Sequence, residues 1–306
     1  SSDPVRLNVA DGDFVGGTTT VSAAGESYPP SLDLTIDGVS VQTRASLEST
    51  PYFVFETSQT DFYFRNGVRI GEDVLHIFDE GTYERTETIA VPVPLTYVTQ
   101  GEPLSVDVWA GTKAGPWIDE AENNDDFVIS GMRLVLPDGR TLRPAGYDDP
   151  SQLVQMGDSA GKNDVYASVF DLGDDAFTAL AHDWDTTTVD DGAHEVVATD
   201  GPDRASAQVL VDNTAPVVTP SVEDGRVYQG EIVLDAAVED GAGSGVVDLV
   251  ATFDGNPVVL PFTTSSVVLA AGDHVLTVVA TDAVGNLTER AVTFVVPEEQ
   301  PGADGV

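Results

Sequence analysis

The densest group of candidate metal ligands in the sequence is one acidic stretch near the middle of the chain. It offers the carboxylate and amide oxygens of Asp119, Glu120, Glu122, Asn123, Asn124, Asp125 and Asp126. Proteins bind Ca²⁺ through about six to eight oxygen atoms, and closely spaced carboxylates and amides supply several of them. We therefore expect a Ca²⁺ site formed by Asp119, Glu122, Asn124, Asp125 and Asp126. The alternative is a solvated acidic loop, because the stretch does not match the EF-hand pattern.

Aromatic residues close to this stretch are candidates for sugar binding. The apolar C–H face of a sugar ring packs on the π-face of an exposed aromatic side chain. Trp117 lies between glycine, proline and acidic residues in GTKAGPWIDE, so we expect it in a loop. Tyr83 and Tyr147 are further candidates for the same ligand. Trp109 lies in an alternating strand pattern and is expected in the core.

Catalytic constellations are not evident in the sequence. The chain has no cysteine and no P-loop, dinucleotide-binding, H-E-x-x-H or G-x-S-x-G motif. His194 and His274 occupy equivalent positions of an internal repeat, which leaves only His76 and His182, too few for a convincing metal triad. Ser159, in Gly-Asp-Ser, resembles a hydrolase serine only superficially, although contact with His182 would favour hydrolysis. We therefore expect no catalytic residue.

Composition and charge restrict the partners of the chain. The 52 acidic residues outnumber 13 basic ones, for a net charge of −39. Such a surface repels nucleic-acid phosphates and anionic lipids, which argues against both as partners. No apolar run is long enough for a membrane-spanning helix. A start at SSDP is typical of a chain whose signal peptide has been removed, so we expect an extracellular protein.

An internal repeat organises the rest of the chain. Its two copies share Asp-Gly turns, glycines, histidines and acids at matching positions: Asp11-Gly12 and Asp224-Gly225, Gly17 and Gly230, Asp37-Gly38 and Asp254-Gly255, His194 and His274, Asp200 and Asp282. Each Asp-Gly pair at 37 and 254 predicts a tight hairpin turn. The paired histidines are expected to have a structural role at a strand start.

The first copy of the repeat is interrupted. Asp37 and His194 are 157 positions apart, whereas Asp254 and His274 are 20 apart. The excess of roughly 137 residues is too long for a loop and is the size of a small domain. We therefore expect an inserted domain over 57–183, a discontinuous first domain over 1–56 plus 184–215, and a second complete copy over 216–297. Residues 298–306 are expected to be a linker-like tail.

Two family resemblances give these domains a fold. WDTTTVDDGAH, a valine-rich strand and VDNTAP at 184–216 resemble bacterial Ig-like repeats of secreted multidomain proteins. The strands flanking Asn66-Gly67, those around Pro92 and Pro94, and the acidic run at 123–126 resemble galactose-binding-like jelly rolls of carbohydrate-binding modules. The resemblances imply an Ig-like β-sandwich interrupted by an inserted jelly-roll β-sandwich and followed by a second Ig-like β-sandwich, an all-β fold.

These expectations combine into one functional hypothesis. The chain would be a non-catalytic accessory region of a secreted bacterial protein, in which the jelly roll binds a polysaccharide or cell-surface glycan and the Ig-like domains are spacers. Further domains of the same chain are expected partners. The alternatives are a structural or adhesive array without a ligand site, and part of a secreted hydrolase whose catalytic domain lies elsewhere. Turn acids such as Asp240, Asp254 and Asp282 either bind Ca²⁺ between domains or cap turns.

Overall fold

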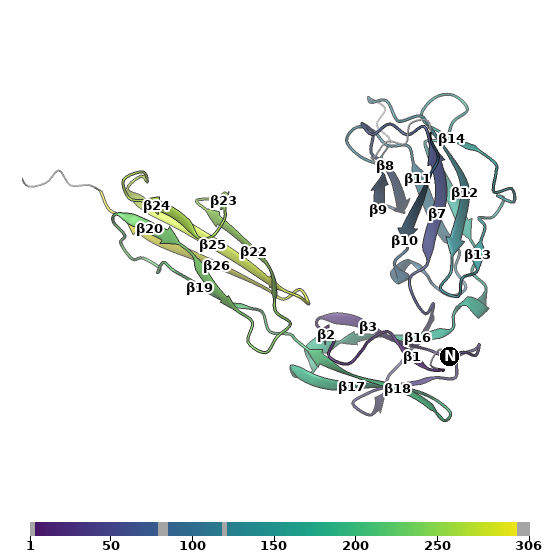
Figure 1. Ribbon diagram of the computed structural model, residues 1–306, viewed down its shortest axis with the longest axis horizontal. Coiled ribbons are helices and arrows are strands. Elements are labelled where there is room, and N and C mark those ends of the chain that lie inside the picture. Colours follow the sequence, from purple (N-terminus) through teal and green to yellow (C-terminus); the bar gives the residue numbers. More distant parts are fainter. Residues whose placement is uncertain (1–3, 79–84, 118–120, 299–306) are drawn as a thin grey trace, which may run out of the picture. The chain divides into compact units, whose positions relative to one another are not determined.

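The structure is a computed structural model that describes residues 4–78, 85–117 and 121–298 (Figure 1). Its regular elements are almost all β-strands, and the described helices are three short 3₁₀ turns: η1 (Leu95–Tyr97), η2 (Asp174–Ala176) and η3 (Thr186–Thr188). The predicted all-β fold is therefore confirmed. Within the described residues, no helix has the length and apolar character needed to cross a bilayer.

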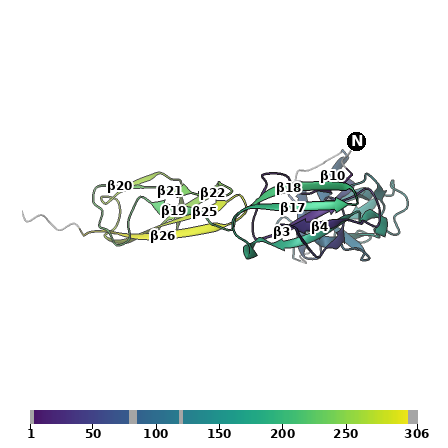
Figure 2. The same ribbon diagram turned by 90° about the horizontal axis from the view of Figure 1, so that it is seen from below.

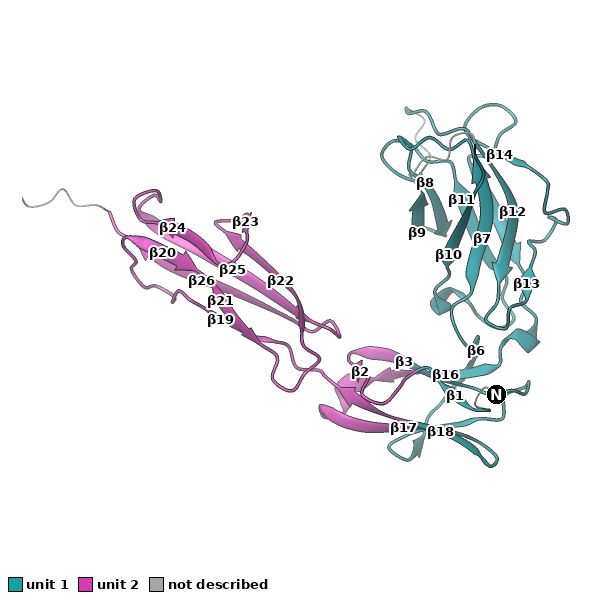
Figure 3. Ribbon diagram, viewed as in Figure 1, with its two compact units in different colours: residues 1–8, 21–182, 197–206 teal, residues 9–20, 183–196, 207–306 magenta. Residues whose placement is uncertain are grey.

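The chain divides into two compact units (Figure 3). Unit 1 contains residues 1–8, 21–182 and 197–206, and unit 2 contains residues 9–20, 183–196 and 207–306. Hydrogen bonding between strands identifies which segments fold together.

One pair of sheets combines strands from both sides of the predicted interruption. The first sheet has the order β1 (Arg6–Leu7), β3 (Thr18–Ala24), β16 (Ala179–Asp185), β6 (Arg44–Ser46). The second has the order β2 (Phe14–Val15), β18 (Asp203–Val211), β17 (Gly192–Asp200), β4 (Asp33–Ile36), β5 (Val39–Ser40). Figure 2 shows β17 and β18 side by side. Strands before residue 47 thus pair with strands after residue 178; we call these two sheets the first sandwich.

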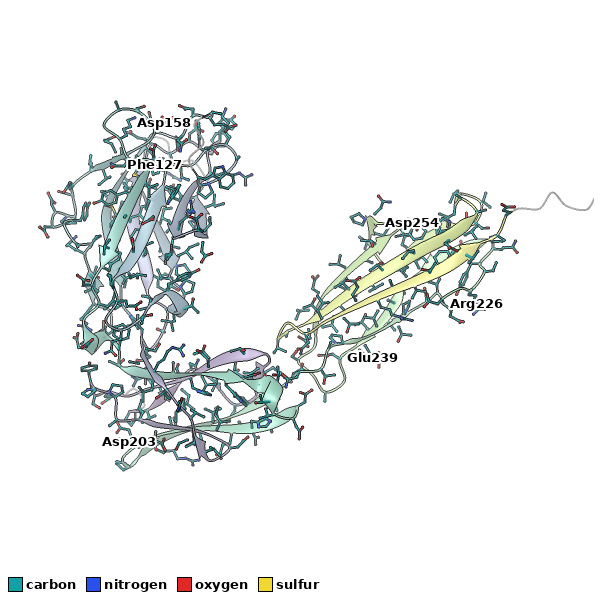
Figure 4. The ribbon with its side chains drawn as sticks, turned by 180° about the vertical axis from the view of Figure 1, so that it is seen from behind. Phe127, Asp158, Asp203, Arg226, Glu239 and Asp254 are labelled. Atoms are coloured by element: carbon teal, nitrogen blue, oxygen red, sulfur yellow. The ribbon has the colours of Figure 1, made fainter. Side chains whose placement is uncertain are left out.

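The strands between these segments form two further sheets, which we call the inserted sandwich. One sheet has the order β10 (Glu87–Pro92), β7 (Tyr52–Ser58), β12 (Phe127–Val135), β13 (Thr141–Leu142), with β14 (Val154–Met156) also paired to β12. The other has the order β15 (Val165–Phe170), β11 (Leu104–Trp109), β8 (Asn66–Ile70), β9 (Asp73–Phe78). Phe127, which is labelled in Figure 4, shares one buried core with Phe55 of its own sheet and with Val106 and Phe170 of the other sheet.

Strand pairing moves the boundaries expected for the insert. Residues up to 56 were expected in the first domain, but β7 pairs with β10 and β12 of the inserted sandwich. Phe53 and Phe55 are fully buried in its core. At the other end, Ala179–Ala181 already pair with β6, ahead of the expected start at 184. The alternating pattern of PYFVFET suits any half-buried strand, so it does not reveal which sandwich the strand joins.

The second sandwich contains the remaining strands. These are β19 (Val217–Pro220) paired with β21 (Ala236–Glu239), β20 (Glu231–Leu234) paired with β24 (Phe262–Ser265), and a sheet of order β23 (Asn256–Val258), β22 (Val246–Phe253), β25 (Gly272–Asp282), β26 (Leu287–Val296). Ile232, Phe253, Leu276 and Phe294 belong to a shared core, so the sheets pack face to face.

The two copies of the repeat have matching turns. Asp37 and Asp254 have φ of 50° and 49°, and the glycine that follows each has φ of 78°. Two successive residues with positive φ are typical of a type I′ hairpin turn, for which Asp-Gly is favoured. The strands on each side pair directly, as β4 with β5 and β22 with β23. Both predicted hairpin turns are therefore confirmed.

Matching hydrogen bonds support the same equivalence. In the first copy, Asp11 Oδ1 accepts a hydrogen bond from Gln208 N at 2.7 Å. In the second copy, Asp224 Oδ1 accepts one from Thr293 N at 2.8 Å. A carboxylate that binds a distant backbone amide fixes the start of a sandwich to its final strand. The two copies of the repeat thus share equivalent hydrogen bonds as well as equivalent residues.

The two equivalent histidines have the predicted structural role. His194 Nε2 donates to Asp190 O, and His274 Nε2 donates to Ala270 O, each at 2.8 Å. Each imidazole thus fastens the start of a long strand to the turn before it. His274 also places Nδ1 2.7 Å from Asp254 Oδ2. Since both ring nitrogens face acceptors, the protonated ring satisfies them best.

Protonation of His274 should stabilise the second sandwich. Burial opposes the charge, but the hydrogen bonds to Ala270 and Asp254 outweigh it and raise the pKa of His274 above 6.5. A raised pKa gives stability that is present in full below 6.5 and is lost as pH rises through the folded-state value. We expect the urea midpoint of this sandwich to fall across that window. His274→Gln should remove the pH dependence, and its persistence in that variant would contradict the assignment.

Candidate functional site

The buried members of the acidic stretch hold loops together. Asn124 and Asp125 are 2% and 4% exposed. Asp125 Oδ2 accepts hydrogen bonds from Asp61 N at 2.9 Å and Asn66 Nδ2 at 2.7 Å. Asn124 Nδ2 donates to Ala110 O at 2.5 Å. Burial raises the pKa of Asp125 against these hydrogen bonds. Both side chains therefore connect loops of the inserted sandwich through buried hydrogen bonds.

The other expected calcium ligands do not gather with them. Glu122 is exposed, and Asp126 forms an ion pair with Lys162 at 2.6 Å. Asp119 lies outside the described residues. Among the part of the chain that is described, no three carboxylates of this stretch converge on a common point. A Ca²⁺ site in this stretch stays a prediction.

The expected sugar-binding aromatics fall into three classes. Trp117 is 46% exposed, in agreement with its expected place in a loop. Tyr147 is fully buried, and its hydroxyl accepts from Gly131 N and donates to Gln152 O. Tyr147 is thus a core residue and cannot offer a stacking face, which corrects the expectation. Tyr83 lies outside the described residues.

Trp109 is also placed differently from the expectation. The core face of β11 carries Val106 and Val108, so the alternation turns Trp109 to the other face of the sheet. There the guanidinium of Arg69 lies 4.0 Å from the centre of the indole ring. Arg69 is 5% exposed and donates to Pro116 O at 3.1 Å. This stacked pair therefore supports the loop that carries Trp117.

An exposed aromatic pair, which the sequence did not single out as a unit, lies in another loop of the inserted sandwich. Phe62 and Tyr63 are 52% and 65% exposed, and their ring centres are 4.0 Å apart. Adjacent aromatic residues after a strand were the available signal. Together with Trp117, they are large aromatic side chains in loops of this sandwich that remain accessible to a ligand.

A second group of carboxylates does converge, in unit 2. Asp212 follows β18, Asp240 follows β21, and Asp282 ends β25. One carboxylate oxygen of each lies within 4.8 Å of the others. Asp212 and Asp282 are only 2% and 1% exposed. We call these three residues the junction cluster, because Asp212 begins the segment that leads from β18 to β19.

Backbone amides orient each carboxylate of the junction cluster. Asp282 Oδ1 accepts from Asn286 N at 2.8 Å. Asp240 Oδ2 accepts from Gly245 N at 2.6 Å, and Asp212 Oδ2 accepts from Ser244 N at 2.7 Å. The amides neutralise part of the charge and leave further oxygen lone pairs for another ligand. The sequence folds this way because short acidic side chains cap tight turns.

The turn at Gly243 brings two of these carboxylates together. A Cβ atom at Gly243 would lie 2.6 Å from Asp240 Oδ2 and 2.8 Å from Asp212 Oδ2. Only glycine permits so close an approach, because any larger residue would push the oxygens apart. Asn286 completes the arrangement, since its Nδ2 donates to Asp282 Oδ2 at 2.8 Å and to Asp212 O at 3.0 Å.

The electrostatics of the junction cluster favour a cation. In the described residues, no lysine, arginine or histidine forms an ion pair with any of the three carboxylates. Buried carboxylates are costly unless they are paired or coordinate a metal. The neighbouring Ser244 Oγ is buried without a hydrogen-bond partner. Asp212 and Asp240 also line a hollow of about 450 Å³. A set of oxygen atoms fits a hard cation such as Ca²⁺.

The sequence identified part of this cluster. Asp240 and Asp282 were among the turn acids expected to bind Ca²⁺ or cap turns, and both cap turns. Asp254 caps the start of β25 through Val275 N instead. Asp212 was missed, although it lies in VDNTAP, one of the segments that carry the Ig-like resemblance.

The Ser159–His182 contact that would favour a hydrolase is not formed. His182 Nδ1 donates to Gln42 O at 2.8 Å. Ser159 Oγ donates to Asp126 Oδ2 at 3.5 Å, which is a weak contact. Each side chain thus has a different neighbour, and neither is placed to activate the other.

Comparison with known proteins shows where a related sequence occurs. No protein-family model matches the chain. The chain is 36% identical over 298 residues to the uncharacterized protein YvnB of Bacillus subtilis (strain 168). The match covers 97% of this chain and 23% of that protein, so the chain spans about a quarter of the length of this relative.

Solved structures show only distant likeness. Fibronectin(III)-like modules of Clostridium thermocellum CbhA are 11% identical, with a TM-score of 0.24 and coverage of 96% of this chain and 94% of that one. Drosophila OTK extracellular domains 3–5 are 9% identical, with a TM-score of 0.23 and coverage of 97% and 98%. At such TM-scores the fold assignment depends on the strand pairing described above.

Removing the Asp125 carboxylate should destabilise the inserted sandwich. Asp125→Ala leaves Asp61 N and Asn66 Nδ2 without their acceptor, which costs about 1–3 kcal/mol for each buried group. Asp126→Asn, an exposed neighbour, should change stability by less than about 1 kcal/mol. Urea unfolding measures both. If Asp125 instead bound Ca²⁺, the loss in Asp125→Ala would vanish when wild type and variant are compared in chelator.

Proposed function

We propose that the chain is a non-catalytic accessory region of an extracellular protein. In this proposal the first and second sandwiches are Ig-like spacer domains, and the first is a single domain interrupted by the inserted sandwich. Ca²⁺ at the junction cluster fixes the segment between them, and the inserted sandwich binds a carbohydrate. The observation that carries the proposal is the convergence of three carboxylates, two of them almost fully buried, where the chain leaves β18.

Calcium binding would have a mechanical consequence in unit 2. Asp212 precedes the connection to β19, whereas Asp240 and Asp282 cap turns next to β21 and β25. An ion shared by all three carboxylates links that connection to both turns. Pro216 follows in the same connection and has a fixed φ, which restricts the segment further. A spacer gains stiffness when the segment between its modules is held at several points.

Carbohydrate binding by the inserted sandwich is the second part of the proposal. Nearly half of the surface of Trp117 is exposed. Its loop is held by Arg69, which stacks on Trp109 and donates a hydrogen bond to Pro116 O. A preorganised aromatic platform binds with less loss of conformational entropy. Phe62 and Tyr63 supply a second exposed aromatic surface in the same sandwich. The second candidate function, a structural or adhesive array, requires no such platform.

Calcium should stabilise the protein through the junction cluster. Binding to the native state alone adds about 2.7 kcal/mol at a ligand concentration a hundredfold above Kd. We expect millimolar Ca²⁺ to raise one thermal transition of the chelator-treated protein, and Asp282→Asn to abolish the rise. If Asp282→Asn does not fold, Asp240→Asn, which changes a more exposed carboxylate of the cluster, replaces it in the same measurement.

Asp126→Asn is the matched control, because it removes an acidic side chain outside the cluster and should retain the full rise. Isothermal titration calorimetry gives the stoichiometry. A protein whose transitions are the same in Ca²⁺ and in chelator has no such site.

Glycan binding should depend on Trp117. A glycan array, followed by titration with the best polysaccharide, should show binding that Trp117→Ala weakens by about tenfold or more. Tyr52→Ala is the matched control, because Tyr52 is also 46% exposed in the inserted sandwich but lies on strand β7. Equal losses in both variants would contradict a specific platform. No binding by the wild-type protein would favour the array function.

A further inference from the structure

Among the described residues, the second sandwich lacks one strand that the first sandwich has. In the first, β16 lies between β3 and β6. In the second, among the described residues, β24 pairs with β20 alone. The edge strand β24 therefore has backbone N–H and C=O groups on one side that no other described strand uses. Such an edge is a template for pairing with another strand.

Matching hydrogen bonds identify β24 as the counterpart of β16. Thr186 N, just after β16, donates to Gly17 O at 2.9 Å, just before β3. Ser266 N, just after β24, donates to Gly230 O at 3.0 Å, just before β20. The same bond at the same place in both copies shows that β24 corresponds to β16 and β20 corresponds to β3.

The missing strand follows from chain length. In the first sandwich β6 pairs antiparallel with β16, with Ser46 opposite Ala179 and Arg44 opposite Ala181. In the second sandwich β23 ends at Val258 and β24 begins at Phe262. The short link between β23 and β24 connects the two sheets. It is too short to form an additional strand equivalent to β6.

Apolar side chains are exposed in β22 and in the link from β23 to β24. Leu32 and Leu249 precede the two Asp-Gly turns at equivalent positions, yet Leu32 is 8% exposed and Leu249 is 43% exposed. Val250 and Val259 are 49% and 86% exposed. Together with Val258 and Leu260 they line a hollow of about 240 Å³. The same position is buried in one copy and open in the other.

The chemistry of this edge indicates its occupant. The strand β24, Phe-Thr-Thr-Ser, has no charged residue, although natural edge strands are commonly protected by lysine or proline. Between positions 217 and 296 the chain has 11 acidic residues and two arginines. An incoming strand with a basic residue therefore meets favourable charge, as Arg44 of β6 provides in the first sandwich.

We propose that the free edge of β24 binds an extended strand of a partner polypeptide by β-augmentation. The strand pairs with β24 as β6 pairs with β16, through main-chain hydrogen bonds. Its small or apolar side chains cover Leu249 and Leu260, and a basic residue faces the acidic surroundings. The recognised chemistry is an extended, basic, weakly apolar segment.

Titration of the isotope-labelled full chain with a peptide tests the proposal. The probe is a capped peptide of residues 42–47, which contains the β6 sequence of the first sandwich. We expect NMR shifts confined to Phe262–Ser265 and to the hollow at 249–260, with slower exchange of amides in β24. The same peptide with alternate amide nitrogens methylated should bind roughly tenfold more weakly, because it loses its donors.

Surface variants separate this site from others. Leu249→Asp should weaken peptide binding, and Val259→Asp replaces it if that variant does not fold. Leu287→Asp, which alters a residue 57% exposed at the start of β26, is the matched control and should bind normally. Shifts elsewhere, or none, overturn the proposal. Self-association of the chain that Leu249→Asp abolishes would also overturn it, because the occupant would then be a second copy.

Discussion

The antiparallel pairing of β6 with β16 is the interaction on which the arrangement of the chain depends. Ala179 lies opposite Ser46 in this ladder, although the whole inserted sandwich lies between them in sequence. A domain can be inserted into another only if its own ends lie close together. This short ladder meets that requirement, since it brings the entry and exit of the insert side by side at the edge of one sheet. The two parts of the first sandwich therefore meet in one sheet despite their separation in the sequence.

The sequence predicted the features that recur and missed those that do not. The Asp-Gly turns and the structural histidines occur twice, so comparison of the two copies identified them, and the structure places them alike. The strand β7 occurs once. Its alternation of apolar and polar residues is compatible with either sandwich, and only the partners of Phe53 and Phe55 decide the matter. A local pattern of apolar and polar residues predicts a strand, whereas pairing with distant strands determines the sheet to which it belongs.

The candidate sites show the same limit. The acidic stretch at 119–126 is dense in sequence, but its described side chains turn to different partners, such as Asp61 and Lys162. The junction cluster is sparse in sequence and converges in space, since its members belong to three separate turns. Similarly, Tyr147 is a core residue because its hydroxyl finds backbone partners within its own loop. The sequence could predict which residue types form these sites. Only the folded structure shows which of their side chains come together in space.

The discontinuity of the first sandwich imposes an order on its synthesis. When β3 leaves the ribosome, its neighbour β16 lies more than 150 positions further along the chain, so the central ladder of that sheet cannot close. The insert, whose strands are contiguous in sequence, becomes complete before β16 to β18 are made. Domains generally fold as units during translation. Until an entire neighbouring domain has folded, β3 can pair only with β1 and β4 only with β5, so the strand edges that later bind β16 and β17 stay exposed to chaperones or to misfolding.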